Sequence, residues 1–123
     1  MAEIINNDER KTLSVLAFLF FRMGMEERSK RIYEALAELS APGSSDWRFA
    51  QAGMAAIEVE AGRGAEALGH LKAAMEGGPL STKDAALHLL KSQALWQQGR
   101  KAEAEAARDE FLRLSGAANA QQP

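Results

Sequence analysis

The sequence contains no cysteine among its 123 residues, so disulfide bonds and thiolate metal sites are excluded. A chain without cysteine is typical of a reducing compartment. The sequence also lacks an excess of positive charge, because its 15 Lys and Arg residues stand against 17 Asp and Glu residues. Without a basic field, we expect neither nucleic acid nor an anionic membrane surface as a partner.

A segment that could cross a membrane is missing as well. The most apolar stretch, Leu13 to Met23, holds nine apolar residues in eleven, whereas a spanning helix needs about 20. The first ten residues lack the positively charged leader and the small-residue cleavage site of a signal peptide. We therefore expect a cytoplasmic protein with no membrane insertion.

Helical periodicity is what the sequence does contain. Apolar residues recur at helical spacing, and no segment shows the alternation of a strand. Candidate N-caps are Asn7 or Asp8 for the first helix and Ser45 or Asp46 for the third, and Ser81 with Asp84 forms a capping-box pattern before the fifth. The sequence predicts an all-α protein with six helices, at about 8–23, 26–39, 47–61, 65–75, 82–98 and 101–114.

Three glycines divide these helices into pairs. Gly24, Gly62 and Gly99 are separated by 38 and 37 residues, and each is expected to end the first helix of a pair. Five residues beyond each glycine stands a small residue, where paired helices can cross closely: Ser29, Ala67 and Ala104. We predict a flexible N-terminus over 1–7, a three-repeat helical domain over 8–115 with repeats at about 8–41, 46–79 and 82–115, and a disordered tail over 116–123.

The repeats resemble tetratricopeptide repeats, which are helix-turn-helix units of 34 residues. The small residue, the larger residue four positions on (Tyr33 and Leu71) and Pro79 at the end of the second repeat match that family's pattern. The repeats here are longer, and Arg108 departs from the pattern in the third. The resemblance implies a short right-handed superhelix whose first helices line a concave groove. An unrelated helical bundle is the alternative.

In that geometry, large apolar side chains and alanines line the groove, and they suit an extended apolar or helical peptide from a client protein. Core packing is the alternative for each of them. Leu13, Leu16, Ala17 and Phe20 are expected to face the core instead. The predicted client-binding residues are Val15, Phe18, Phe21, Phe49, Ala52, Ala56, Leu89, Gln93 and Trp96.

The sequence holds no pattern of residues that indicates catalysis. His70 and His88 are its only histidines, and neither has the cysteine or carboxylate spacing of a metal or nucleophile site. The segment Gly62–Gly64 is too short for a phosphate-binding loop. We expect no enzyme activity, no cofactor and no metal.

A narrower resemblance covers about residues 8 to 114. Three features are similar to the small repeat chaperones of bacterial type III secretion systems. They are the strongly apolar first helix, its M-G-M-E-E-R ending and the stretch D-W-R-F-A-Q-A-G-M-A-A-I-E-V-E-A-G-R-G-A-E-A-L. The D-x-R-F opening at Asp46–Phe49 is shared with SycD-type translocator chaperones, whereas the chain length is closer to the YscY type.

This resemblance implies a cytosolic chaperone that binds a secreted or export-apparatus client and delivers it to the export gate. The alternative is a structural scaffold or assembly adaptor, which holds fixed partners together or forms a homodimer through the apolar first helix.

Overall fold

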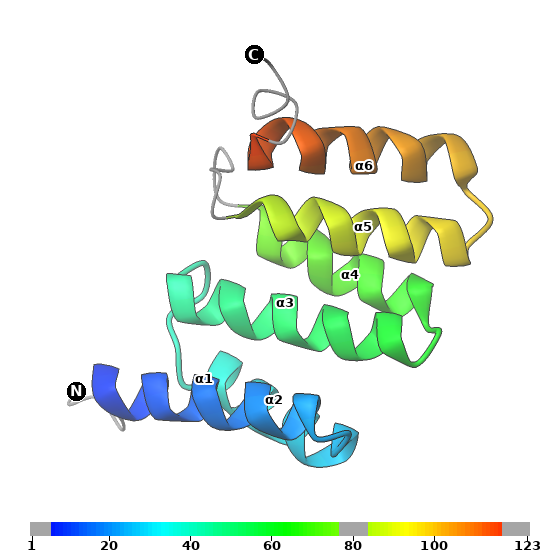
Figure 1. Cartoon of the computed structure of the whole chain (residues 1–123). Helices are drawn as coiled ribbons and strands as arrows, with labels where there is room; N and C mark the ends of the chain where they lie inside the picture. Colours follow the sequence, from blue (N-terminus) through cyan, green and yellow to red (C-terminus); the bar gives the residue numbers. More distant parts are fainter. Residues whose placement is uncertain (1–5, 77–83, 117–123) are drawn as a thin grey trace.

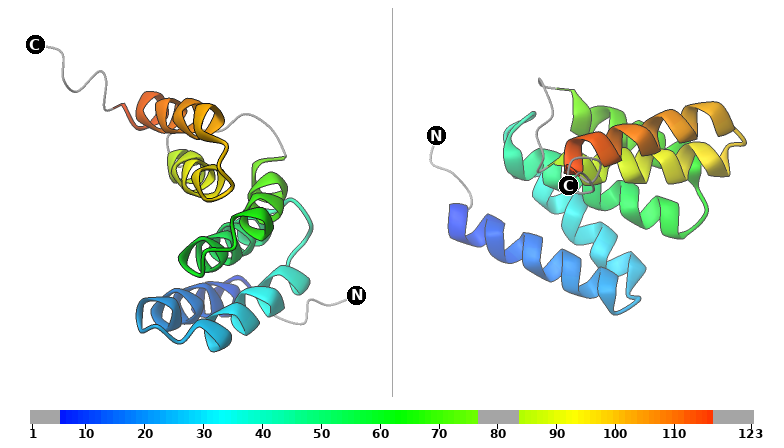
Figure 2. Two further views of the ribbon diagram at one scale, coloured as in Figure 1. Left: turned by 90° about the vertical axis from the view of Figure 1, so that its right-hand side faces the viewer. Right: turned by 45° about the horizontal axis from the view of Figure 1, so that its top comes forward.

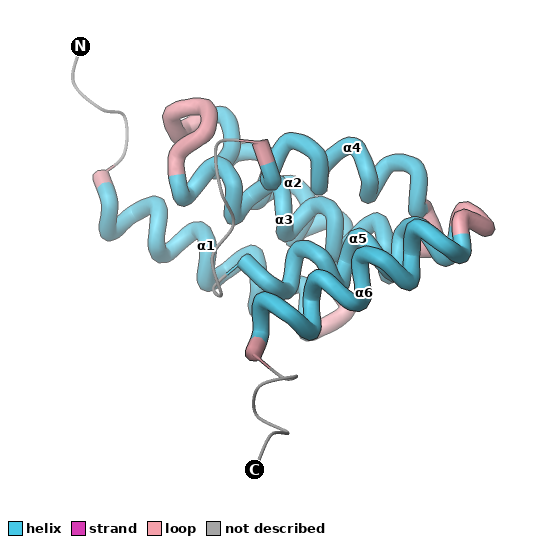
Figure 3. The backbone as a smooth tube through the Cα atoms, turned by 90° about the horizontal axis from the view of Figure 1, so that it is seen from above, coloured by secondary structure: helices cyan, strands magenta, loops and turns pink. Residues whose placement is uncertain are grey.

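The computed structural model describes residues 6–76 and 84–116, and these form six α-helices and no strand (Figures 1 and 3). The prediction of an all-α chain with six helices is therefore confirmed. Of the predicted N-terminus (1–7) and tail (116–123), residues 1–5 and 117–123 lie outside the described residues. The helices are α1 (Asn7–Arg22), α2 (Glu26–Glu38), α3 (Ser45–Glu60), α4 (Gly64–Met75), α5 (Ala85–Gln97) and α6 (Lys101–Ser115).

The six helices stack in chain order as three antiparallel pairs, with α1 and α2 at one end and α6 at the other (Figures 1 and 2). Each helix packs against the next, and the first helices also contact one another, α1 with α3 and α3 with α5. Among the described residues, the second helices α2, α4 and α6 make no such contacts with each other. The arrangement is an all-α helical-repeat fold, in which the first helices form a continuous row.

Glycines end the first helix of each pair, as predicted. Gly24, Gly62 and Gly99 have φ angles of +77°, +79° and +73°. Such left-handed backbone suits glycine because it has no Cβ atom. The three turns therefore share one geometry at the predicted spacing.

The helix N-caps differ from the predicted ones by a residue or two. Asn6 caps α1 and forms a capping box with Glu9, and this places residues 6 and 7 in the structured part of a segment expected to be flexible. Ser44 caps α3 by accepting a bond from the backbone N–H of Trp47. The predicted capping box of Ser81 with Asp84 is not tested, because Ser81 lies outside the described residues; the described helix α5 begins directly after Asp84.

The small residues predicted at the helix crossings are buried. Ser29, Ala67 and Ala104 are at most 2% exposed. In the first pair, the Ser29 hydroxyl donates to the Ala17 carbonyl at 2.7 Å. In the third pair the donor lies on the first helix instead of the second: the Ser92 hydroxyl donates to the Ala104 carbonyl, also at 2.7 Å. A side chain larger than serine would separate the two helices at these points.

Most of the core lies between successive pairs, and a further cluster joins α5 to α6 within the third pair. One cluster joins Tyr33 and Leu36 of α2 to Met54 and Ile57 of α3, and a second joins α4 to α5. Leu13 and Ala17 pack into the first cluster as expected. Leu16 is exposed, so its assignment to the core is wrong. Leu16 lies on the side of α1 that no other described helix covers.

Two equivalent ion pairs tie the first helices together. Arg10 Nε lies 3.2 Å from an Asp46 carboxylate oxygen, and Arg48 Nη2 lies 3.8 Å from an Asp84 carboxylate oxygen. Both members of the second pair stand 38 residues after those of the first. Asp46 and Arg48 are also the charged residues of the D-x-R-F motif, so in this chain that motif links neighbouring repeats.

Candidate binding surface

The nine predicted client-binding residues all lie on the first helices α1, α3 and α5. Six of them are exposed: Val15, Phe18, Phe49, Leu89, Gln93 and Trp96. Five of these six are large apolar side chains, which soluble proteins usually cover when they lie close together. The row of first helices α1, α3 and α5 thus exposes apolar side chains that are not buried in the described core.

The remaining three residues are half-buried. Phe21 packs against the core cluster between the first two pairs, and Ala52 packs against the second cluster. Ala56 is half-buried on α3. Phe49, although exposed, has its ring centroid 5.9 Å from that of the buried Tyr33. Phe21 and Ala52 are therefore partly core residues, whereas Phe18 and Trp96 are exposed and do not belong to the core clusters.

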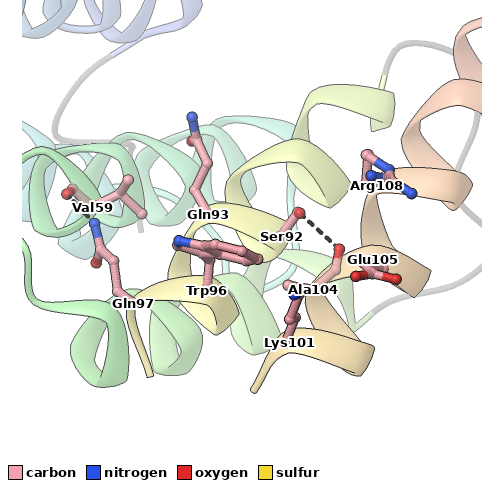
Figure 4. Close-up of a pocket in the computed structure, with 9 residues that line it drawn as sticks. All are labelled: Val59, Ser92, Gln93, Trp96, Gln97, Lys101, Ala104, Glu105 and Arg108. Carbon is pink, nitrogen blue, oxygen red and sulfur yellow. Dashed lines mark hydrogen bonds between the residues drawn. The ribbon is translucent and has the colours of Figure 1, made fainter. Parts of the chain in front are cut away.

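A cleft of about 520 Å³ opens between α5 and α6, with one contribution from α3 (Figure 4). Its volume falls within the usual range of ligand pockets. Two of the predicted residues, Gln93 and Trp96, line it. The full lining is Val59, Ser92, Gln93, Trp96, Gln97, Lys101, Ala104, Glu105 and Arg108.

Trp96 dominates the apolar part of this cleft and is 60% exposed. Lys101 Nζ lies 5.8 Å from its ring centroid, within the range of a cation–π contact. Arg108 and Glu105 complete the α6 wall. The cleft can therefore accept an apolar side chain next to a charged group.

The residues that α6 contributes were not predicted from the sequence. The prediction used only the first helix of each pair, as the family resemblance implies. Lys101, Glu105 and Arg108 recur at helical spacing along one side of α6. That spacing, combined with Arg108 in place of an expected apolar residue, is the signal in the sequence that could have located this wall.

A charged cluster joins the first two helix pairs on another part of the molecule. Arg63 Nη2 contacts a carboxylate oxygen of the buried Glu58 at 2.7 Å and one of Glu26 at 2.9 Å. The hydrogen bond from Arg63 holds the pKa of Glu58 below its usual value, although burial opposes the shift. Glu58 is therefore anionic near neutral pH, and it anchors the turn between α3 and α4.

We expect this cluster to make stability depend on pH in the acid range. A carboxyl group with a lowered pKa in the folded state stabilises the protein above the unfolded pKa of about 4.3, and that contribution is lost as the pH falls through the folded pKa. Glu58→Gln should therefore cost about 1 kcal/mol at pH 7, since Arg63 is partly exposed to solvent. The cost should shrink on acidification, as measured by urea denaturation from pH 7 to pH 3.

The matched control for this experiment is Glu110→Gln. Glu110 forms a similar pair with Arg113, which also lowers the pKa of its carboxyl, but the side chains of Arg113 and Glu110 are 66% and 44% exposed to solvent. This variant should leave stability unchanged within error. Equal effects of the two substitutions at every pH would contradict the role given to Glu58.

The two histidines lie in separate places. His70 Nδ1 is 2.9 Å from Gln51 Oε1, and burial lowers the pKa of its imidazole. Burial likewise lowers the pKa of His88 on α5. Among the described residues, no group of three or more His, Cys, Asp and Glu side chains could hold a metal ion. Over the same residues, no helix is both long enough and apolar enough to cross a membrane.

The fold and surface define an all-α helical-repeat protein with apolar side chains exposed along its first helices. Comparison with protein-family models finds no match, and no curated protein is similar to this chain at a significant level.

Proposed function

We propose that this protein binds a client protein without catalysis, through an apolar concave groove formed by α1, α3 and α5. The observation that carries the proposal is the exposure of Phe18, Phe49, Leu89 and Trp96 on that row of helices. Each large apolar side chain that a client covers contributes about 1.5–3 kcal/mol. An apolar segment of a client is therefore the ligand that suits this surface.

The proposed biological role is that of a cytosolic type III secretion chaperone, which stabilises a secreted or export-apparatus client and delivers it to the export gate. This narrower role is supported by the residues of the sequence that resemble the YscY-type and SycD-type chaperones. In physical terms, the client stabilises the chaperone in return, because a ligand that binds only the folded form raises its stability.

A single substitution in the cleft tests client binding. Trp96→Glu should reduce client affinity by about tenfold or more, because it removes the largest exposed apolar side chain and adds a negative charge. The measurement is affinity purification of the tagged chain from its native host, followed by titration of the purified client against each variant. Circular dichroism should show unchanged helicity, since Trp96 is mostly exposed.

The control is Ala102→Glu, which adds the same charge to an exposed position of α6 outside the cleft lining. It should bind the client as the unmodified protein does. If Trp96→Glu unfolds the protein, the side chain belongs to the core and the proposed groove is wrong. If both variants bind equally well, the client uses another surface.

The second candidate is a structural scaffold or assembly adaptor that holds fixed partners or self-associates. The exposed apolar residues of α1 favour it, because they lie at one end of the stack. A scaffold would occur in a stable assembly and would not solubilise an otherwise insoluble protein. Co-expression with the identified partner, with and without this chain, distinguishes the two functions by the soluble fraction of the partner.

A further inference from the structure

The three helix pairs share one set of crossing points, which relates their residues to one another. Paired helices cross at Ala17 and Ser29, at Ala55 and Ala67, and at Ser92 and Ala104. The second crossing stands 38 residues after the first, and the third stands 37 residues after the second. The turn glycines have the same two intervals. Any residue of one pair can therefore be compared with its equivalent in the next.

At the first two junctions, the first helix of one pair covers the preceding pair. Helix α3 contacts both α1 and α2, and α5 contacts both α3 and α4. The covered side chains include Tyr33 and Leu36 of α2 and Leu71 and Ala74 of α4, and each is at most 3% exposed. The chain itself thus shows what lies against the exposed side of a helix pair, namely one further first helix.

At the third pair, the equivalent side chains line the open cleft. Its residues Ser92, Trp96, Ala104, Glu105 and Arg108 stand 37 positions after Ala55, Val59, Ala67, Leu68 and Leu71, which all pack in the second core cluster. Trp96 is 60% exposed, and Arg108 is exposed where Leu71 is buried. Figure 4 shows Trp96 and Arg108 on the two helices that flank the cleft. No described helix covers these residues, and we call this part of α5 and α6 the open junction.

The helices at the first two junctions show which residues such a helix presents. In α3, Ala50, Met54 and Ile57 pack in the first core cluster at positions i, i+4 and i+7, and Gly53 lies at i+3. In α5, the equivalent positions i, i+3 and i+7 also pack in a core cluster, and they hold Leu87, Leu90 and Ala94. Both stripes are small or apolar and follow helical spacing. Continuity with these two interfaces makes a helix the occupant that fits the open junction.

Arg108 sets the charge that this helix needs. Its equivalent in the first pair, Tyr33, faces position i+3 of α3, since a Cβ atom at Gly53 would lie 2.3 Å from Cζ of the Tyr33 ring. Arg108 Nη2 lies 3.4 Å from a carboxylate oxygen of Asp109, but these side chains are 56% and 68% exposed, so the pair is weak. A helix that covers Arg108 removes the guanidinium from water, and a carboxylate at i+3 compensates for that loss.

Glu105, the anion on the same wall, lies at the margin of the open junction. Its equivalent Leu68 is only half-buried, whereas Leu71, the equivalent of Arg108, is 1% exposed. Solvent therefore screens Glu105 more than Arg108 once a helix is in place. The charge at the centre of the interface is positive.

A second copy of the chain supplies a helix that fits this charge poorly. Its α1 would occupy the open junction as α3 occupies the first. Lys11 of α1 is the equivalent of Phe49, whose ring centroid lies 5.9 Å from that of Tyr33. Lys11 of that copy would therefore stand against Arg108, and like charges repel.

The arginine that links neighbouring repeats is also missing at the open junction. The equivalent of Arg48 in α5 is Ala85, so Asp8 of a second copy, the equivalent of Asp46, meets no arginine there. Within the chain, the residues 117–123 that follow α6 number seven, fewer than the 13 of α5. A helix from another protein fits the open junction better than either.

We propose that the open junction binds a helix of the client, which carries small or apolar residues at i, i+4 and i+7 and an acidic residue at i+3, opposite Arg108. The identity of the supplier rests on the proposed function, and this helix is the client segment that covers Trp96. It packs on α5 and α6 as α5 packs on α3 and α4.

Two peptides built on α3 test the open junction of the full chain. Both have the sequence of Ser45–Glu60, which already fills a junction of this kind, with Gly53→Glu in one and Gly53→Lys in the other. Neither can replace α3 at the first junction, because a side chain at position 53 meets the Tyr33 ring. Fluorescence anisotropy should show that the Glu peptide binds about tenfold more tightly than the Lys peptide.

Variants of the full chain locate the binding. Arg108→Glu should reverse the preference, so that the Lys peptide binds about tenfold more tightly. Trp96→Ala should weaken both peptides, because it removes apolar contact without adding charge. The control Ala102→Glu, at an exposed position of α6 outside the cleft, should change neither. Since Arg108 is exposed, its replacement keeps the test valid if the Trp96 variant unfolds.

Three outcomes would overturn the proposal: equal binding of the two peptides, no binding, and a dimer in sedimentation experiments that Trp96→Ala converts to a monomer. Client binding distinguishes this failure from failure of the proposed function. If the peptides fail while Trp96→Glu still abolishes client binding, the groove remains and the helix is wrong. If the peptides bind as expected while the client is indifferent to Trp96→Glu, the client is not the supplier and the proposed function is wrong.

Discussion

Replacing Leu36 with alanine is expected to lower the free energy of unfolding by about 2–5 kcal/mol. Leu36 is fully buried in the cluster that joins the first two helix pairs, so the substitution removes apolar contacts and leaves a cavity. Since small domains are stable by only about 5–15 kcal/mol, a loss of this size removes much of the total. Urea denaturation followed by circular dichroism measures it.

Leu112→Ala is the matched control for this prediction. Leu112 is the same residue type on α6 but is 39% exposed, so its truncation should cost well under half as much. Equal losses in the two variants would show that the interface between α2 and α3 does not dominate stability. An unfolded Leu36→Ala variant would agree with the prediction and would place the cost at the upper end of the range.

Gly53→Ala is expected to destabilise the protein by about 1–3 kcal/mol, even though alanine is the better helix former. A Cβ atom at Gly53 would lie 2.3 Å from Cζ of the Tyr33 ring, which is buried between α2 and α3. The ring or the helix would have to move. Thermal unfolding compared with the unmodified protein measures the effect.

Gly69→Ala is expected to have the opposite effect on the stability of the protein. Gly69 also lies inside a helix, but a Cβ atom there meets nothing within 4 Å. This substitution should stabilise the protein by about 0.5–1 kcal/mol. Tyr33→Leu should relieve part of the Gly53→Ala penalty, since a smaller side chain then opposes the added methyl group. If Gly53→Ala and Gly69→Ala changed stability in the same direction, this result would contradict the close packing of α2 on α3.

The helix boundaries could be predicted because glycines mark them. Gly24, Gly62 and Gly99 take left-handed backbone angles at the predicted spacing. N-caps were less predictable, since Asn6 and Ser44 each stand beside other residues that can cap equally well. Local sequence alone does not choose among adjacent residues of similar chemistry.

The orientation of α1 could not be predicted in full. Nine of the eleven residues from Leu13 to Met23 are apolar, so hydrophobic periodicity does not identify a single buried side. The sequence predicts Leu16 in the core, yet Leu16 is exposed because no helix precedes α1 in the stack. Phe21, assigned to the groove, also packs against the core. A repeat at the end of a stack has one neighbour fewer than the pattern assumes.

The ion pairs between repeats were missed for a different reason. Arg10 and Arg48, like Asp46 and Asp84, are 38 residues apart, but charged residues on helices are most simply explained as solvent-facing. The same repeat spacing that aligns the glycines also aligns these charged positions, so it contains the signal for both pairs.

Arg48 also affects how far the loop between the second and third repeats can change in length. Its Nε donates to the Ala74 carbonyl near the end of α4 at 2.7 Å, while its Nη2 reaches Asp84 at the start of α5. One guanidinium group thus fixes both ends of the connection between the second and third repeats. Because lengthening a loop costs little once its ends are held, this joint should accept insertions without disturbing the stack.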